Sequence, residues 1–124
     1  MPNRRECIRC ELLGVSLEPS LHGETLDISE TGIAWVSEVP FNQGETAMVE
    51  SPALFDTLDL PWAPIEVRIR DLAQLDEEHW RIGAEFVAPH TRIVVALRRA
   101  LLRLQRQGNE LDSHVIDVLV LPHA

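Results

Sequence analysis

Short stretches in which apolar and polar residues alternate dominate the first two thirds of the chain. The clearest is residues 65–69, where Ile65, Val67 and Ile69 alternate with charged residues. A period of two places alternate side chains on opposite faces of a β-strand, so each such stretch predicts a strand with one buried face. The stretches and the turns between them predict six short strands, over residues 13–17, 21–28, 33–36, 47–49, 65–69 and 82–86.

Helical periodicity appears once, after Pro89. The apolar residues that recur there at helical spacing are Ile93, Leu97, Ala100, Leu101 and Leu104. Gly108 is a typical residue at the end of a helix, so we predict one helix that follows Pro89 and runs to about Gln107. The prolines within residues 51–64 predict a loop, with one helical turn around residues 54–55.

Six strands followed by a helix predict one domain dominated by β-structure, a small antiparallel barrel or sandwich with one C-terminal α-helix. We expect a flexible lead-in at residues 1–10, the barrel and helix at residues 11–108, and a C-terminal extension at residues 109–124. The extension contains an apolar stretch, residues 115–121, that predicts an extra strand. We expect this strand to cover the back of the helix or to pair with a second molecule, as in a homodimer.

Composition excludes several classes of protein. The chain has 124 residues, of which 45% are hydrophobic and 25% charged, a balance typical of a folded domain. Its net charge of -9 argues against general affinity for DNA or RNA, which depends on neutralising phosphates. No apolar run approaches the roughly 20 residues of a membrane-spanning helix, and the N-terminus lacks the apolar stretch of a secretory signal. We therefore expect a cytoplasmic protein.

All eleven basic residues are arginine, and most of them are clustered. One cluster is Arg4, Arg5 and Arg9, and a second lies within residues 92–106. The planar fork of arginine binds a phosphate or a guanine edge through two parallel hydrogen bonds. A small anion can therefore bind at such a cluster even though the chain as a whole is acidic.

Two motifs carry the most specific chemistry. Residues 5–9 (RECIR) fit the pattern RxxxR, and residues 27–32 (DISETG), between two predicted strands, fit [D/N]xSxxG. In these motifs, and in residues 81–86 (RIGAEF), the sequence resembles the PilZ domain family over roughly residues 4–107. Thr31 stands where members of that family often have glycine. The resemblance implies a six-stranded antiparallel PilZ-like barrel with a helix after the last strand.

The resemblance also implies binding of one or two molecules of cyclic dimeric GMP (c-di-GMP), a bacterial second messenger, and no other cofactor. The ligand-binding residues that it implies are Arg4, Arg5, Arg9, Asp27, Ser29 and Gly32. The arginines can meet guanine O6 and N7 or a phosphate. Asp27 can accept from guanine N–H groups, Ser29 can donate to a ligand oxygen, and Gly32 allows a positive φ and close approach of the ligand. We expect the lead-in to fold over the ligand and so to signal to an unidentified effector protein.

Two alternatives involve no nucleotide. Residues 27–32 are also typical of an ordinary hairpin turn, in which Asp27 and Ser29 cap backbone groups. A protein–protein adaptor with the same fold would suit the acidic composition, and Val95 and Leu102 place two apolar side chains on the back of the predicted helix. Titration with c-di-GMP separates such an adaptor from a receptor.

Evidence for an enzyme is weak. Cys7 and Cys10 form a single CxxC, and a zinc site would need two more ligands, which the five histidines do not provide at a suitable spacing. We interpret the pair as ordinary reduced cysteines, with a redox pair as the alternative. The sequence has no nucleophile-elbow serine and no phosphate-binding glycine loop. Of the three tryptophans, we expect Trp62 to be exposed, because it lies in the proline-rich loop.

Overall fold

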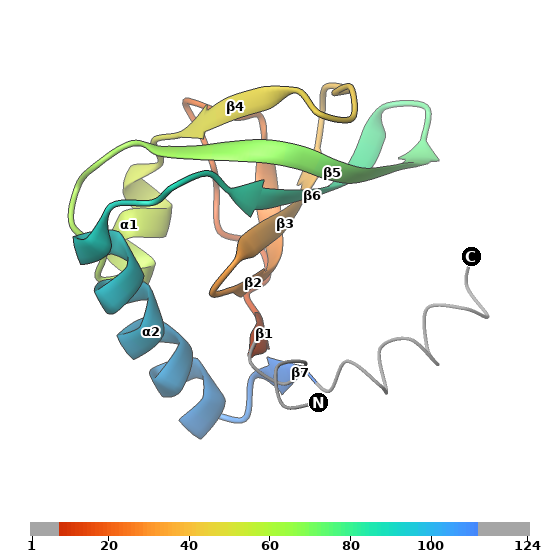
Figure 1. Ribbon diagram of the computed structural model, residues 1–124. Coiled ribbons are helices and arrows are strands. Elements are labelled where there is room, and N and C mark those ends of the chain that lie inside the picture. The colour runs from red at the N-terminus through yellow and green to blue at the C-terminus, as the bar shows by residue number, and fades with distance from the viewer. Residues whose placement is uncertain (1–7, 112–124) are drawn as a thin grey trace, which may run out of the picture.

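The computed structural model describes residues 8–111, and within them seven antiparallel strands form one curved sheet with two helices on one side (Figure 1). The strands are β1 (Arg9–Glu11), β2 (Gly23–Ser29), β3 (Gly32–Ser37), β4 (Thr46–Val49), β5 (Ile65–Asp76), β6 (His79–Phe86) and β7 (Glu110–Leu111), and the helices are α1 (Pro52–Leu58) and α2 (Thr91–Arg106). The sheet order is β4-β5-β6-β3-β2-β1-β7. The predicted fold class, mainly β-structure with a helix after the barrel strands, is confirmed.

The sheet is not a closed barrel, because β4 and β7 remain as its two edges. The segment between β1 and β2 joins β2 to the chain that follows β4. On the β2 side, Ser16 forms an isolated bridge with Glu24. On the other side, the Ser51 hydroxyl donates to the Ser16 carbonyl at 2.6 Å, and the Glu50 N–H donates to the Ser20 hydroxyl at 2.8 Å. The Ser20 and Ser51 hydroxyls therefore join two segments that a closed barrel would join by the pairing of two strands.

The prediction of a strand at residues 13–17 is wrong. Gly14 has a φ of +76°, which interrupts the extended backbone that a strand requires. The first strand is instead β1, so residues 9–10, which we expected in the flexible lead-in, lie within the sheet. Residues 1–7, with the rest of that lead-in, and the strand predicted at residues 115–121 lie outside the described residues.

Helix α1 corrects the loop predicted at residues 51–64. The Ser51 hydroxyl accepts a hydrogen bond from the Leu54 N–H at 3.0 Å, which caps the start of the helix. Pro52 is in the first turn, where a missing N–H costs nothing. The helix ends at Asp59, which adopts a left-handed conformation with a φ of 56°. A proline that indicates a loop in the sequence thus marks the start of a helix.

Helix α2 agrees with the predicted helix and packs against the sheet and α1. Its apolar stripe is buried at Ile93, Leu97, Ala100 and Leu101. The Arg103 guanidinium donates to the Leu58 carbonyl at 3.1 Å and so joins α2 to the end of α1. Neither helix of the described part is long and apolar enough to cross a membrane.

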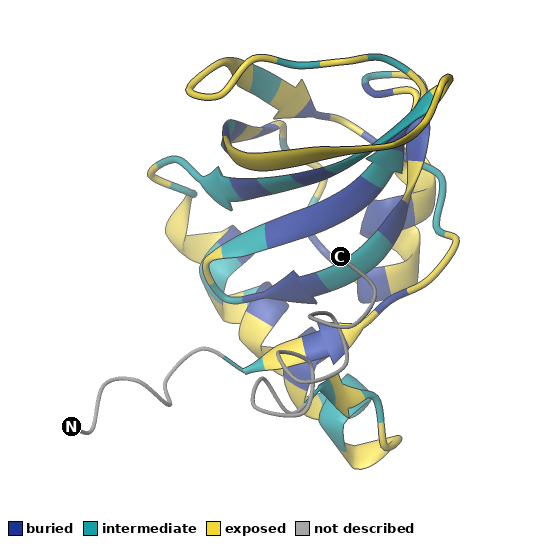
Figure 2. Ribbon diagram, turned by 90° about the vertical axis from the view of Figure 1, so that its right-hand side faces the viewer, coloured by how far each residue is buried: buried dark blue, intermediate teal, exposed yellow. Residues whose placement is uncertain are grey.

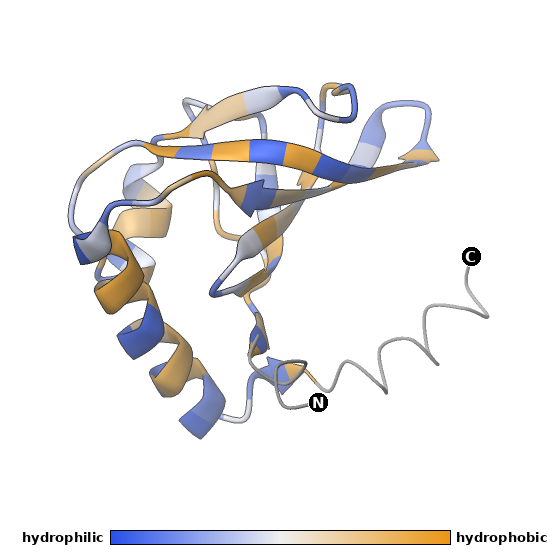
Figure 3. Cartoon of the chain, in the orientation of Figure 1, coloured by the Kyte–Doolittle hydropathy of each residue, from blue (hydrophilic) through white to orange (hydrophobic). Residues whose placement is uncertain are grey.

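The hydrophobic core lies between the sheet and the helices (Figure 2). Trp35 of β3 is fully buried in it and packs edge-to-face against Phe41, with ring centroids 5.9 Å apart. Along β5 the buried residues Ile65, Val67 and Ile69 alternate with polar ones, as Figure 3 shows. The central strands of the sheet therefore turn one face into the core, and the opposite face is free to form a site.

Candidate functional site

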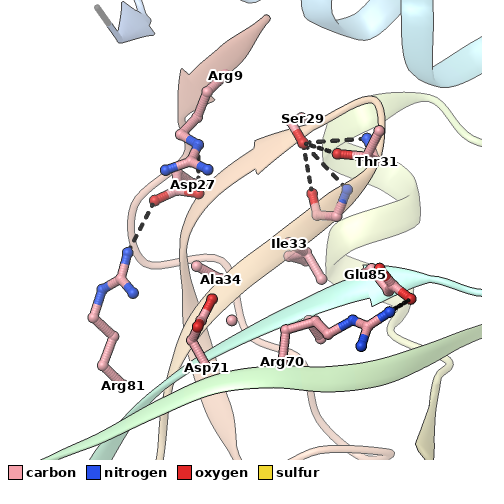
Figure 4. Close-up of a pocket in the computed structure, with 13 residues that line it drawn as sticks. Arg9, Asp27, Ser29, Thr31, Ile33, Ala34, Arg70, Asp71, Arg81 and Glu85 are labelled. Carbon is pink, nitrogen blue, oxygen red and sulfur yellow. Dashed lines mark hydrogen bonds and ion pairs between the residues drawn. The ribbon is translucent and has the colours of Figure 1, made fainter. Parts of the chain in front are cut away.

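A hollow of about 190 Å³ opens on the face of the sheet that is turned away from the helices. Residues of five strands, β1, β2, β3, β5 and β6, line it. In β1, the Cys10 thiol points toward α2 and lies 3.7 Å from the Leu101 carbonyl oxygen. Neighbouring residues of a strand point to opposite faces, so Arg9 lies on the side of the hollow (Figure 4). The hollow is thus formed by the polar faces of the strands.

Four residues aligned by the strand register form the floor of this hollow. From β2 to β5, they are Asp27, Ala34, Gly83 and Asp71. The two central residues have only a methyl group and a hydrogen as side chains. An added Cβ at Gly83 would lie 3.6 Å from Cβ and Oδ2 of Asp71, which is an ordinary contact distance. The centre of the floor is therefore open, and a carboxylate stands at each end.

Asp27 lies between two arginines. Its Oδ1 is 3.9 Å from Nε of Arg9, and its Oδ2 is 3.8 Å from Nη2 of Arg81. The Asp27 side chain is 15% exposed, against 44% and 41% for the two arginines. At these distances the arginines are held electrostatically without a direct hydrogen bond, and exposed pairs of this kind contribute at most ~1 kcal/mol. A ligand can therefore take over these groups at little cost.

A second ion pair stands on the β5–β6 side of the hollow. Nη2 of Arg70 donates to Oε2 of Glu85 at 2.6 Å. This hydrogen bond lowers the pKa of the Glu85 carboxyl and raises the pKa of Arg70, so both groups stay charged at neutral pH. The described lining thus carries three arginines and three carboxylates in alternation: Arg9, Arg70, Arg81, Asp27, Asp71 and Glu85.

Ser29 uses its hydroxyl within the turn between β2 and β3. Its oxygen accepts from the N–H groups of Thr31 and Gly32, both at 3.2 Å, and it lies 3.2 Å from the Thr31 hydroxyl. The Ser29 side chain is buried, although the residue lines the hollow. The contacts of this serine are therefore those of the hairpin-turn interpretation.

Gly32 is a glycine for a different reason from the one we expected. Its φ lies outside the left-handed region. A Cβ at this position would lie only 2.2 Å from the Ala84 carbonyl oxygen of β6, which is closer than any real Cβ contact. The expectation of a positive φ is thus wrong, because close packing between β3 and β6 is what requires glycine here.

The sequence prediction therefore identified one side of the hollow. Arg9, Asp27, Ser29 and Gly32 all line it, whereas Arg4 and Arg5 lie outside the described residues. Among the lining residues that the sequence analysis missed are Ala34, Arg70, Asp71, Arg81, Gly83 and Glu85. For Arg70, Arg81, Gly83 and Glu85 the signal was the alternation of polar with apolar residues along two predicted strands, which indicates a polar face but not which strand lies beside which.

Other candidate chemistry lies away from the hollow. Cys10 is a free, fully buried cysteine, and burial, followed by the charge of Glu110, raises the pKa of its thiol. This makes it a poor nucleophile and weakens the redox-pair alternative; Cys7 lies outside the described residues. Within residues 8–111 no group of three or more metal-ligating side chains is present. Trp62 is 63% exposed, as predicted, and packs edge-to-face on Phe55.

No protein-family model and no curated protein matches this sequence. Solved structures resemble the fold, among them the following three. The first is a protein from Xanthomonas campestris described as a tetrameric PilZ domain assembled through an unusual helical bundle, with 22% identity, a TM-score of 0.51 and coverage of 69% of this chain and 46% of that one. The second is MotI/DgrA, the inhibitor of motility of Bacillus subtilis, with 19% identity and a TM-score of 0.55; the match covers 86% of this chain and 51% of that one. The third is MrkH from K. pneumonia, with 18% identity and a TM-score of 0.53; the match covers 69% of this chain and 39% of that one.

This chain thus spans about half the length, or less, of the structures that it matches. Identities below a quarter carry information about the fold alone. The strand order with its following helix, and these matches, show that the chain has a PilZ fold.

Proposed function

We propose that this protein is a receptor for cyclic dimeric GMP and that the ligand binds in the hollow on the outer face of the sheet. The observation that carries the proposal is the position of Asp27, a motif carboxylate on an open floor between Arg9 and Arg81. A carboxylate accepts two parallel hydrogen bonds from the N1–H and N2–H groups of guanine. The flanking arginines suit guanine O6 and N7 or a phosphate.

The charge distribution around the hollow lacks the excess of negative charge that the chain has as a whole. The chain has a net charge of -9, which repels phosphates in general. Around the hollow, however, Arg9, Arg70 and Arg81 balance the three carboxylates of the lining. The second arginine of the RxxxR motif lines this hollow, and we propose that Arg4 and Arg5 add the positive charge that a dianionic ligand needs.

We further propose that binding changes the conformation of the N-terminal lead-in and signals to a partner protein. Arg9 is on β1, which pairs with β2 on one side and with β7 on the other. A shift of Arg9 toward the ligand would therefore disturb the pairing with Leu111, the last described residue of the C-terminal extension. On the helix side, Nε of Arg98 lies 3.2 Å from Glu30 in the motif turn, so a change in that turn also reaches α2.

Calorimetric titration of the full chain with c-di-GMP tests the proposal. Arg5→Ala, Arg9→Ala and Asp27→Ala should each weaken binding about 10- to 150-fold, because each removes a charge-assisted contact of ~1.5–3 kcal/mol. The matched control is Arg99→Ala, which removes a positive charge from the exposed side of α2. Circular dichroism verifies that each variant is folded. Equal affinity of wild type, Arg5→Ala and Arg9→Ala would contradict the proposed arginine contacts.

One observation favours a second candidate, a protein–protein adaptor without a nucleotide ligand. Val95 and Leu102, seven residues apart on α2, are 42% and 46% exposed and lie on a helix with five arginines and no acidic residue. Such a face fits an acidic partner. If wild-type protein binds no c-di-GMP, the adaptor is the function that the fold supports.

A further inference from the structure

Each end of the floor of the hollow carries a carboxylate with arginine nearby. On β2, Asp27 lies between two arginines at 3.8 and 3.9 Å. On β5, Asp71 directly follows Arg70, whose side chain also lines the hollow (Figure 4). Each end of the floor thus combines a carboxylate with guanidinium groups, and only the two small central residues separate them.

The Asp71 carboxylate is available to a ligand. Within residues 8–111 it accepts no hydrogen bond and forms no ion pair, and the residue is exposed. Its Oδ2 lies over the floor, 3.6 Å from the position of an added Cβ at Gly83. The Arg70 side chain beside it is already paired with Glu85 at 2.6 Å. A ligand that binds Asp71 therefore breaks no hydrogen bond or ion pair of the described residues.

A β-bulge at each end brings both carboxylates to this face. In β5 the pairing with β6 shifts between Ile69 and Asp71, so Arg70 is the extra residue. Strict alternation from the buried Ile69 would turn Asp71 into the core. In β2 the same kind of shift separates the buried Thr25 from Asp27. Bulges that redirect a side chain are frequent beside functional sites.

We propose that Asp71 reads the second guanine of the ligand, while Asp27 reads the first. This inference rests on the proposed function. Cyclic dimeric GMP has two identical halves, and the site offers two carboxylates three strand spacings apart, about 14 Å along the sheet. A carboxylate has only acceptors, so it fits the N1–H and N2–H donors of guanine and rejects adenine, whose N1 is an acceptor. Asp71 thereby makes the site specific for guanine in both halves.

The test compares c-di-GMP with the hybrid cyclic GMP–AMP by calorimetric titration of the full chain. Wild type should prefer c-di-GMP by about 5- to 150-fold, the discrimination of one good bidentate contact. Asp71→Asn should abolish or reverse this preference, because an amide presents both a donor and an acceptor and so matches adenine. Asp71→Ala should abolish the preference without reversing it. Asp56→Asn, the same change on an exposed residue of α1, should leave it intact.

Two outcomes overturn the inference and are distinguishable. If wild type binds c-di-GMP but Asp71→Asn and Asp71→Ala keep the full preference over the hybrid, the second guanine is read elsewhere and the proposed function stands. If wild type binds neither nucleotide, the proposed function fails and the role of Asp71 fails with it. Thermal melting of both variants verifies that they are folded, and we expect little change because the Asp71 carboxylate forms no hydrogen bond or ion pair within residues 8–111.

Discussion

Replacing Gly32 by alanine tests whether the motif glycine serves strand packing. The added Cβ would lie 2.2 Å from the Ala84 carbonyl oxygen, so this oxygen or Gly32 must move by at least 0.8 Å to reach the 3.0 Å below which real Cβ contacts essentially never occur. The movement disturbs the ladder at the pair Gly32–Glu85 and the adjacent hydrogen bond from the Phe86 N–H to the Thr31 carbonyl, 2.8 Å long. Overpacking costs ~1–3 kcal/mol, and a weakened ladder hydrogen bond adds about 1 kcal/mol.

Thermal unfolding followed by circular dichroism, and urea titration, measure this change. We expect a loss of about 2–4 kcal/mol, which for a chain of 124 residues lowers the Tm by roughly 8–15 °C. Gly83→Ala is the matched control, since its Cβ would meet Asp71 at an ordinary 3.6 Å, and we expect its stability to change by less than ~1 kcal/mol. Equal melting temperatures for Gly32→Ala and Gly83→Ala would refute the packing argument.

Two further predictions concern titratable groups. In a Cys7→Ser variant, Cys10 should react with iodoacetamide far more slowly in the native protein than in urea, because burial hides the thiol and raises its pKa. Mass spectrometry measures both reaction rates, and equal rates would contradict this prediction. The hydrogen bond from His79 to Asp76 at 2.9 Å raises the pKa of His79, so its stabilising contribution is present below pH 6.5 and is lost as the pH rises through the raised value. NMR titration should show a lower pKa for His79 in Asp76→Asn than in wild type, and identical values would refute the pairing.

The sequence was informative about the fold wherever a strand has one buried and one solvated face. The alternation at residues 65–69 correctly located the core face of β5 and the helical spacing after Pro89 correctly located α2. The alternation failed for residues 70–76, because both faces of this end of β5 are exposed. At residues 13–17 the alternation of apolar and polar residues predicted a strand that does not form. Leu17 is buried there, but the segment is irregular and pairs with β2 only through the isolated bridge between Ser16 and Glu24.

Only those residues of the candidate site that belong to a sequence motif could be predicted. Asp27 was found from its motif, whereas Asp71 at the other end of the floor was missed. Alternation from Ile69 assigns Asp71 to the inner face, and only the bulge at Arg70, which depends on the neighbouring strand, turns it outward. In β2 the shift between Thr25 and Asp27 has the same effect, so both carboxylates reach one face through the pairing of their strands. A bulge is set by the register between neighbouring strands, which the alternation within a single strand does not contain, and this is why one end of the floor could not be predicted.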